Sequence, residues 1–328
     1  MTDQINELIE AQDMNALLRV IDGLCARARW EELLDLAERC EAAVERGKQL
    51  WPIAAHVDYR LALEAPADYA AEALESPLVR FHLGPLSEVV ASTHTWKEMA
   101  DLIPAPHHAA YVAQERVLRG EVIEGDLRAH LEILELPLRL MQWEPTYALA
   151  HYRSNHVEVA EAWQPRTPLV ATELDDDGDE LDEPEIAGAL LDLVQPWTAE
   201  SNGAAQAAVL EGTARQAASS LTFGKLRMGP LEPAEALQRM AWAGASGGAH
   251  GRRRGAALGR SLGWHTVALL ADLSWPSSPD ELRSGMERLR WWYWDEGAPE
   301  EGWILRLAVE DPDNGWAAAI AATDVLTD

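Results

Sequence analysis

Apolar residues recur at helical spacing through the first half of the chain. Leu17, Ile21 and Leu24 lie three or four residues apart, and a second run over residues 30–46 repeats the spacing. Leucine, alanine, glutamate and arginine dominate both runs, and these are strong helix formers. The pattern predicts helix after helix over residues 1–170.

Two stretches of this part resemble each other. R-W-E-E-L-L-D-L-A begins at Arg29 and T-W-K-E-M-A-D-L-I begins at Thr95, and a looser third copy begins at Asp68. A period in the thirties is typical of stacked helix pairs. Residues 1–170 therefore resemble an α-solenoid of the tetratricopeptide or HEAT type, at class level, since the full consensus of neither family is present. The alternative is chance similarity between amphipathic helices.

The second half of the chain also begins with helical patterns. Ser278 and Glu281 form a capping box with Pro279 in the first turn, which marks a further helix start. The remaining helices are predicted at 187–194, 204–221, 234–243 and about 249–273.

The pattern changes near the C-terminus. R-W-W-Y-W-D-E-G and G-W-I-L-R-L-A-V-E-D are rich in strand formers and predict a two-stranded hairpin at 290–295 and 302–309. The final W-A-A-A-I-A-A-T is predicted as a last helix capped by Asp313. The predicted fold class is mainly α: stacked helical hairpins, then a helical domain with one short β-hairpin.

Charge divides the 328 residues, of net charge −28, into three parts. Residues 1–170 are the helical-repeat domain, and residues 187–328 are the helical domain with the hairpin. Between them, residues 171–186 carry nine acids and no base, which predicts a solvated linker or loop. A calcium loop starting at Asp175 would need glycine and glutamate where Glu180 and Ile186 stand, so the EF-hand pattern fails.

The acidic balance disfavours nucleic acids and anionic membranes as partners. The first residues, M-T-D-Q-I-N-E-L-I-E, lack the basic and apolar regions of a signal peptide. The longest apolar stretch, 264–275, is far shorter than a membrane span of about 20 residues. The cytoplasm is the expected location. Cys25 and Cys40, the two cysteines, are expected to be buried thiols.

The most distinctive stretch is G-A-S-G-G-A-H-G-R-R-R-G-A-A-L-G-R, residues 244–260, because no acid occurs from 236 to 271. Glycine-rich backbone at a helix start and forked guanidinium donors suit a phosphate or carboxylate. Alternatively, glycines at every fourth position from 247 to 263 let a neighbouring helix approach, and the arginines pair with acids. The anion-binding or interface candidates are His250, Arg252, Arg253, Arg254 and Arg260.

Other chemical signatures are weak. The segment has no lysine for a P-loop and lacks the G-x-G-x-x-G fingerprint, and the histidine spacings suit no metal. G-A-S-G-G places Ser246 as in a nucleophile elbow, but a helical run precedes it where a strand is required. We therefore predict no cofactor, no metal and no catalytic residue.

The aromatic run offers a further interface candidate. On a strand, Trp291, Trp292 and Trp294 alternate between a core face and a half-exposed face. The sequence predicts a non-catalytic helical scaffold or protein-interaction protein, whose partner is another protein. The alternatives are a binder of a small anion or nucleotide at 244–260, and an enzyme with a dispersed site that includes His250.

Overall fold

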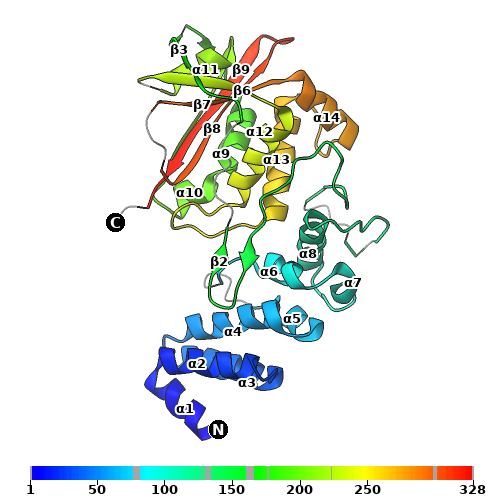
Figure 1. Ribbon diagram of the computed structural model, residues 1–328, viewed down its shortest axis with the longest axis vertical. Coiled ribbons are helices and arrows are strands. Elements are labelled where there is room, and N and C mark those ends of the chain that lie inside the picture. The colour runs from blue at the N-terminus through cyan, green and yellow to red at the C-terminus, as the bar shows by residue number, and fades with distance from the viewer. Residues whose placement is uncertain are drawn as a thin grey trace. The chain divides into compact units, whose positions relative to one another are not determined.

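The structure is a computed structural model that describes residues 2–76, 82–126, 128–129, 134–159, 166–175, 177–222, 224–297 and 301–326 (Figure 1). The chain forms two compact units. The first unit comprises residues 1–133 and 150–158, and the second comprises 134–149 and 159–328. Among the described residues, no helix is long and apolar enough to cross a membrane.

The first unit is built from helices that pack on their neighbours in the chain. Asp13 caps the second helix by accepting a hydrogen bond from the backbone of Ala16 at 3.0 Å. Tyr152, on a small hairpin, donates to the buried Glu88 at 2.7 Å. The elements are α1 (Thr2–Ala11), α2 (Met14–Cys25), α3 (Trp30–Glu45), α4 (Trp51–Glu64), α5 (Ala67–Ala73), α6 (Leu86–Thr93), α7 (Trp96–Met99), α8 (Pro106–Leu118), β1 (His151–Tyr152) and β2 (Val157–Glu158).

The two similar stretches of this unit do not form equivalent elements. Trp30 and Trp96 each begin a helix, and the capping box of Thr95 and Glu98 is present. However, α3 has 16 residues and α7 has four. Local sequence likeness therefore marks two helix starts here, while the lengths of the helices are set by what each one packs against.

The second unit contains a seven-stranded antiparallel sheet, so the predicted mainly α fold is wrong and the protein is mixed α and β. The strands follow the order β3-β6-β7-β8-β9-β5-β4. They are β3 (Val170–Thr172), β4 (Asp179–Glu180), β5 (Ala204–Glu211), β6 (Leu226–Leu231), β7 (Arg290–Asp295), β8 (Trp303–Asp311) and β9 (Trp316–Asp324). The helices are α9 (Pro184–Asp192), α10 (Gln195–Ala199), α11 (Ala214–Ser220), α12 (Pro233–Ala245), α13 (Ala256–Leu270) and α14 (Pro279–Arg288).

The predicted hairpin is confirmed, because β7 and β8 pair antiparallel, but it lies inside the sheet. The helix predicted after Asp313 is wrong, and the helix predicted at 204–221 is right only for its second part, where α11 lies. The strands β9 and β5 occupy the alanine-rich stretches and pair over eight residues. Alanine favours helices locally, whereas strand pairing depends on neighbours that are distant in sequence. The sheet overrides the local preference.

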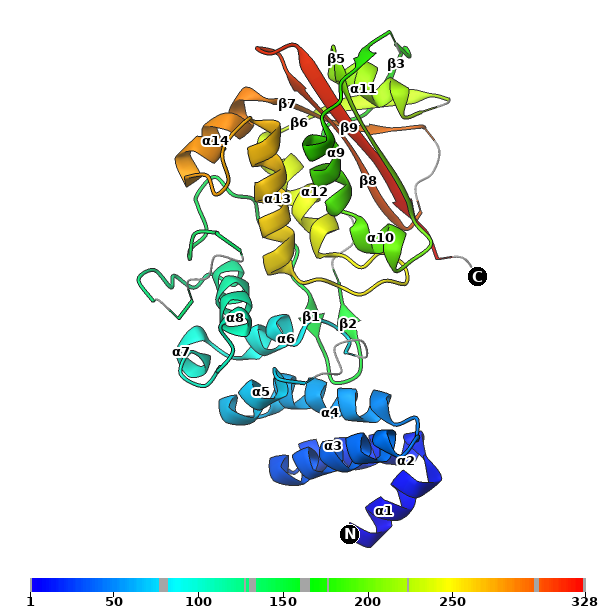
Figure 2. The ribbon, with the colours of Figure 1, turned by 180° about the vertical axis from the view of Figure 1, so that it is seen from behind.

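Helices cover both faces of the sheet (Figure 2). On one face, α9, α10 and α12 lie against the strands, and α13 packs on α9 and α12. The guanidinium of Arg239 in α12 stacks 4.2 Å from the ring centre of Tyr293. On the other face, α11 packs on a core that includes Leu210, Met228 and Trp294. Adjacent residues of β7 therefore point into two different cores.

The acidic segment, residues 171–186, joins the two edges of the sheet. The strand β3 lies at one edge and β4 at the other, and the six residues 173–178 connect them. A flat sheet of seven strands would place these edges about 29 Å apart, beyond the reach of about 25 Å for the connection. The sheet is therefore strongly curved at this end. Asp175 pairs there with Arg215 of α11, so both ends of the segment belong to the second unit.

The long helix predicted from 249 begins at Ala256, and the preceding residues form a loop. Gly247 and Gly251 lie in that loop rather than on a helical strip. Gly259, by contrast, belongs to α13 and faces α12, and a Cβ added there would be 2.2 Å from the carbonyl oxygen of Ala241. Close helix packing thus requires glycine at this position.

Candidate functional site

The arginines of the 244–260 segment contact different acceptors of the same chain. Arg252 pairs with Glu200 at 3.2 Å, and Arg254 donates to the carbonyl oxygen of Asp192 at 2.9 Å. Arg253 is half-buried. The exposed His250 uses its backbone N–H to donate to Ser201. These residues are close together in the sequence, but Arg252, Arg254 and His250 each contact a different residue in the structure.

Arg260 is fully buried in an ion pair with Glu144. Two of its nitrogens lie 2.7 Å from the two carboxylate oxygens, and it also donates to the carbonyl oxygens of Pro137 and Arg139 at 3.1 Å. Arg260 therefore fastens residues 134–149 to α13, which is a structural role.

The candidate aromatic residues are mostly core residues. Trp291 and Trp294 are buried, and their indole nitrogens donate to the carbonyl oxygens of Met286 and Leu307. Trp292 is half-buried and packs at the edge of the core under α11. Ser246 is buried at the end of α12, where its hydroxyl accepts a hydrogen bond from Gly248.

A different part of the second unit has the features of a binding site. A hollow of about 470 Å³ lies where the start of α9, the end of α13 and the start of β9 meet. We call it the acidic hollow. It is lined by Leu181, Glu183, Glu185, Ile186, Leu269, Asp272, Leu273, Asn314 and Trp316. Its volume is within the usual range for ligand sites in proteins.

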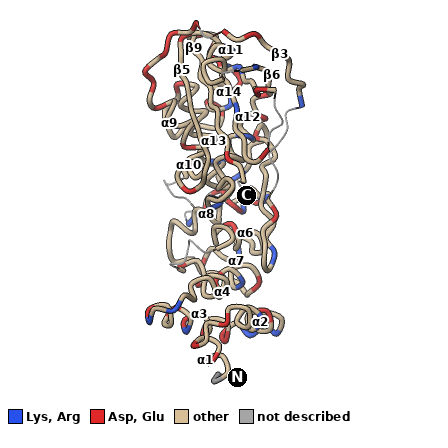
Figure 3. The backbone as a smooth tube through the Cα atoms, turned by 90° about the vertical axis from the view of Figure 1, so that its left-hand side faces the viewer, with Lys and Arg blue, Asp and Glu red and all other residues tan. Residues whose placement is uncertain are grey.

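The charged side chains of the acidic hollow all have the same sign. Glu183, Glu185 and Asp272 are exposed, and no base of the described residues lines the hollow or forms an ion pair with these three acids. Glu183 stands at the cap position of α9 but makes no capping hydrogen bond with its side chain. Figure 3 shows acidic positions gathered near β5 and α9.

Five of the nine residues that line the acidic hollow are apolar. Leu181, Ile186 and Leu269 contribute aliphatic surface, and Trp316 contributes a half-buried indole. Asp272 has a φ of 54°, a left-handed backbone conformation that is uncommon outside glycine. It directly follows the C-cap of α13, and its exposed side chain lines the hollow. Carboxylates around apolar and aromatic surface suit a cation that carries an aliphatic stem.

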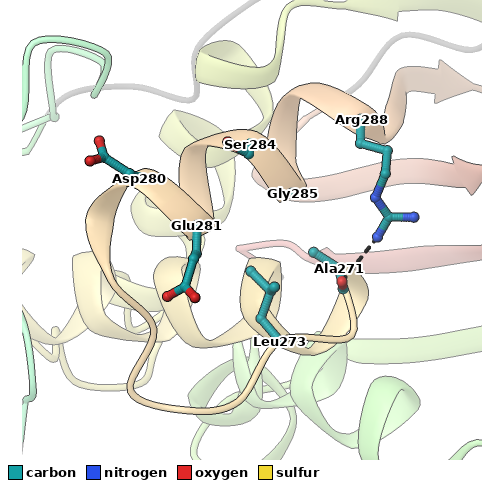
Figure 4. Close-up of a pocket in the computed structure, with 7 residues that line it drawn as sticks. All are labelled: Ala271, Leu273, Asp280, Glu281, Ser284, Gly285 and Arg288. Carbon is teal, nitrogen blue, oxygen red and sulfur yellow. Dashed lines mark hydrogen bonds between the residues drawn. The ribbon is translucent and has the colours of Figure 1, made fainter.

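A second hollow of about 430 Å³ lies on the other side of Leu273, beside α14 (Figure 4). We call it the helix hollow. Figure 4 shows Glu281 and Leu273 directed toward the same space, while Asp280 points away. Hydrogen bonds from Ser278 lower the pKa of the Glu281 carboxyl. This carboxylate is therefore charged at neutral pH.

Arg288, on the wall of the helix hollow, is held in place by two acceptors. It donates to Asp311 at 2.5 Å and to the carbonyl oxygen of Ala271 at 2.9 Å. Asp311 is buried and also accepts from the side chain of Asn314 at 2.9 Å. Burial opposes ionisation of Asp311, but the hydrogen bonds from Asn314 and Arg288 outweigh it and lower its pKa. Asp311 thus connects the walls of the two hollows.

Comparison with known proteins identifies a family but no activity. The sequence matches a protein family over residues 15–326. The chain belongs to the family described as Family of unknown function (DUF6183). The matched range spans both structural units and covers the positions that line both hollows. No curated protein and no solved structure matches the chain.

The sequence did not reveal the acidic hollow. Its lining comes from three separate stretches, at positions 181–186, 269–273 and 314–316, which become neighbours only when the sheet forms. One signal was present: Glu183 and Glu185 belong to the acidic segment, which the sequence singled out. No set of three His, Cys, Asp or Glu among the described residues is arranged to hold a metal ion.

Proposed function

We propose that this DUF6183 protein is a non-catalytic interaction protein, and that its acidic hollow binds a basic side chain of a partner protein. We also propose the cytoplasm as its location. One observation supports the binding role above the others: three carboxylates without an ion-pair partner among the described residues share the lining of one hollow with aliphatic side chains and an indole. Acids in such a setting repel one another until a cation binds.

A lysine or arginine side chain matches each part of this surface. Its aliphatic stem would lie on Leu181, Ile186 and Leu269, and its charged head would reach the carboxylates. A cation over the Trp316 ring would add about 0.5–2 kcal/mol. Since the acids are exposed, the attraction weakens as the salt concentration rises.

The alternatives from the sequence receive less support. Arg252, Arg254 and Arg260 already bind acceptors of their own chain, so an anion would have to compete with these contacts. His250 is exposed, and its backbone N–H is bound to Ser201. We therefore base the proposal on the acidic hollow.

The test compares two capped pentapeptides, acetyl-Ala-Ala-Arg-Ala-Ala-amide and the same peptide with neutral citrulline in place of arginine. Calorimetric titration of the full chain should show binding of the arginine peptide that weakens between 20 and 300 mM NaCl. The citrulline peptide should bind at least tenfold more weakly, because it lacks the charge and keeps the shape.

Variants then locate the site. The triple variant Glu183→Gln, Glu185→Gln, Asp272→Asn should lose binding at least tenfold. A matched triple variant that removes the same charge from the first unit should retain it: Glu7→Gln, Glu31→Gln, Glu38→Gln. Equal losses in the two variants would show that overall charge, rather than the acidic hollow, attracts the peptide.

A further inference from the structure

One edge of the sheet leaves part of a strand without a neighbour. The backbone of Gly212 donates to Gly315 at 2.9 Å, and that of Leu181 donates to Val209 at 2.9 Å. In antiparallel sheets, alternate residues of a strand bond to opposite sides. The even-numbered residues of β5 therefore bond to β9, while Ala205 and Ala207 direct their N–H and C=O groups outward.

The short strand β4 covers only the other end of β5. It pairs with Leu210 and Glu211, and the chain then leaves the edge at Pro184 to form α9. Continuing the register of β4 would have placed residues 183 and 185 opposite Ala207 and Ala205. Among the described residues, no strand occupies these positions. The positions that a longer β4 would occupy, beside Ala205 and Ala207, thus contain no described strand.

Natural proteins usually protect such an edge with a charge, a proline or a bulge. The opposite edge has this protection. There β3 pairs only with residues 226–228 of β6, and the part of β6 beyond β3 contains Pro230, while residues 167–169 lie beside Gly229. By contrast, A-A-Q-A-A at 204–208 is uncharged and pairs with β9 in regular register. Its residues are half-buried or exposed. The contrast between the two edges points to a use for the open one.

The charges around the open edge define its partner. Glu183 and Glu185 directly follow β4, next to where the open part of β5 begins, while Asp179, Glu180 and Glu211 lie at the end of β5 that β4 covers. None of these five acids forms an ion pair among the described residues. A second copy of this chain would bring like charges together at the seam. An extended segment with basic side chains would neutralise them.

We propose that an extended segment of a basic partner protein adds to the sheet beside Ala205 and Ala207, as the continuation of β4. This inference rests on the proposed function and specifies how the partner binds. Leu181 and Glu183, where β4 ends, also line the acidic hollow. A partner strand that continues β4 therefore begins beside the acidic hollow. The side chain of an arginine or lysine at the first position of this strand enters the hollow.

The test uses a capped peptide, acetyl-Arg-Val-Thr-Val-Thr-Val-amide, and variants with a methyl group on one backbone nitrogen at a time. Only alternate amides of an added strand face β5. Methylation at those positions should weaken binding at least tenfold, and methylation at the others should change it less than twofold. Uniform effects at all positions would overturn the strand addition.

Hydrogen exchange gives a second measurement that needs no variant. The amides of Ala205 and Ala207 should exchange at least tenfold more slowly with saturating peptide, while Ala204 and Gln206, already bonded to β9, should change little. If the peptide binds at Trp316 but the amides of Ala205 and Ala207 still exchange fast, binding at the acidic hollow is supported and strand addition is wrong. If it does not bind at all, the proposed function fails as well. A dimer of the free chain that protects the same amides would overturn the partner assignment.

Discussion

Arg260 and Glu144 form an ion pair at 2.7 Å in which both side chains are 0% exposed. The carboxylate also accepts hydrogen bonds from Trp264 at 3.1 Å and Tyr147 at 2.6 Å. Burial, with the neighbouring Glu144 charge, raises the pKa of Tyr147 well above its usual value, so the phenol remains a donor. Every part of this cluster is satisfied, which makes the loss of one member costly.

Replacing Glu144 by glutamine should lower the free energy of unfolding by about 3–5 kcal/mol, because Arg260 would remain buried with its charge unpaired. Urea denaturation followed by circular dichroism measures this. Arg283 and Glu287 form a matched exposed pair at 2.8 Å, and Glu287→Gln should cost less than about 0.5 kcal/mol. Similar losses in the two variants would contradict the role of burial.

Two helical glycines should respond in opposite ways to alanine. At Gly259 an added methyl group would be 2.2 Å from the carbonyl oxygen of Ala241, so Gly259→Ala should force α12 and α13 apart and lower the melting temperature by several degrees. At Gly188 in α9 there is open space, and Gly188→Ala should stabilise the protein by up to about 1 kcal/mol. Thermal unfolding compares them. A stabilised Gly259→Ala variant would refute the close approach.

The Asp311 carboxylate should contribute a pH-dependent part of the stability. Its pKa is lower in the folded chain than the usual 3.8, so its contribution is complete above pH 3.8 and is lost as the pH falls through the folded pKa. Asp311→Asn should cost about 2 kcal/mol at pH 7, because Arg288 loses a charged acceptor.

The control for Asp311 is the exposed Asp280 in the neighbouring helix α14. Asp280→Asn should change the urea midpoint little at pH 7. The gap between wild type and Asp311→Asn should narrow when unfolding is repeated below pH 3.8. A gap that is independent of pH would mean that the Asp311 charge is not what stabilises the fold.

The two thiols should be unreactive in the folded protein. The prediction that both cysteines are buried and free is confirmed. Burial raises the pKa of Cys25 to about 11 and that of Cys40 to about 12, so the thiolate fraction at pH 8 is minute. Ellman's reagent should report no thiol within minutes in buffer and two in 6 M urea. Rapid reaction of either thiol in buffer would contradict their burial.

The sequence predicted some elements well because their signals are local. The caps at Thr95 and Ser278 and the strand pair of 290–295 and 302–309 depend on residues within a few positions of one another. The alanine-rich segments that became β5 and β9 gave the opposite result. Their helix propensity is real, but their pairing joins residues more than 100 positions apart, which no local pattern reports.

The candidate site shows the same division. Glycine and arginine spacing drew attention to residues 244–260, and the structure reveals a packing glycine at 259 and a buried ion pair at Arg260. The acidic hollow and the open edge at Ala205 and Ala207 arise from strand order and from where β4 ends. Those depend on long-range pairing that buries apolar area across the whole sheet.

The sequence by itself thus determined the acidic surface, the buried thiols, several helix starts and one strand pair, because composition and neighbouring residues suffice for these. Tertiary structure alone decided the sheet, the partners of the arginines and the grouping of Glu183, Asp272 and Trp316 around one hollow. Each of these is a contact between distant segments, and its free energy is gained only when the fold brings them together.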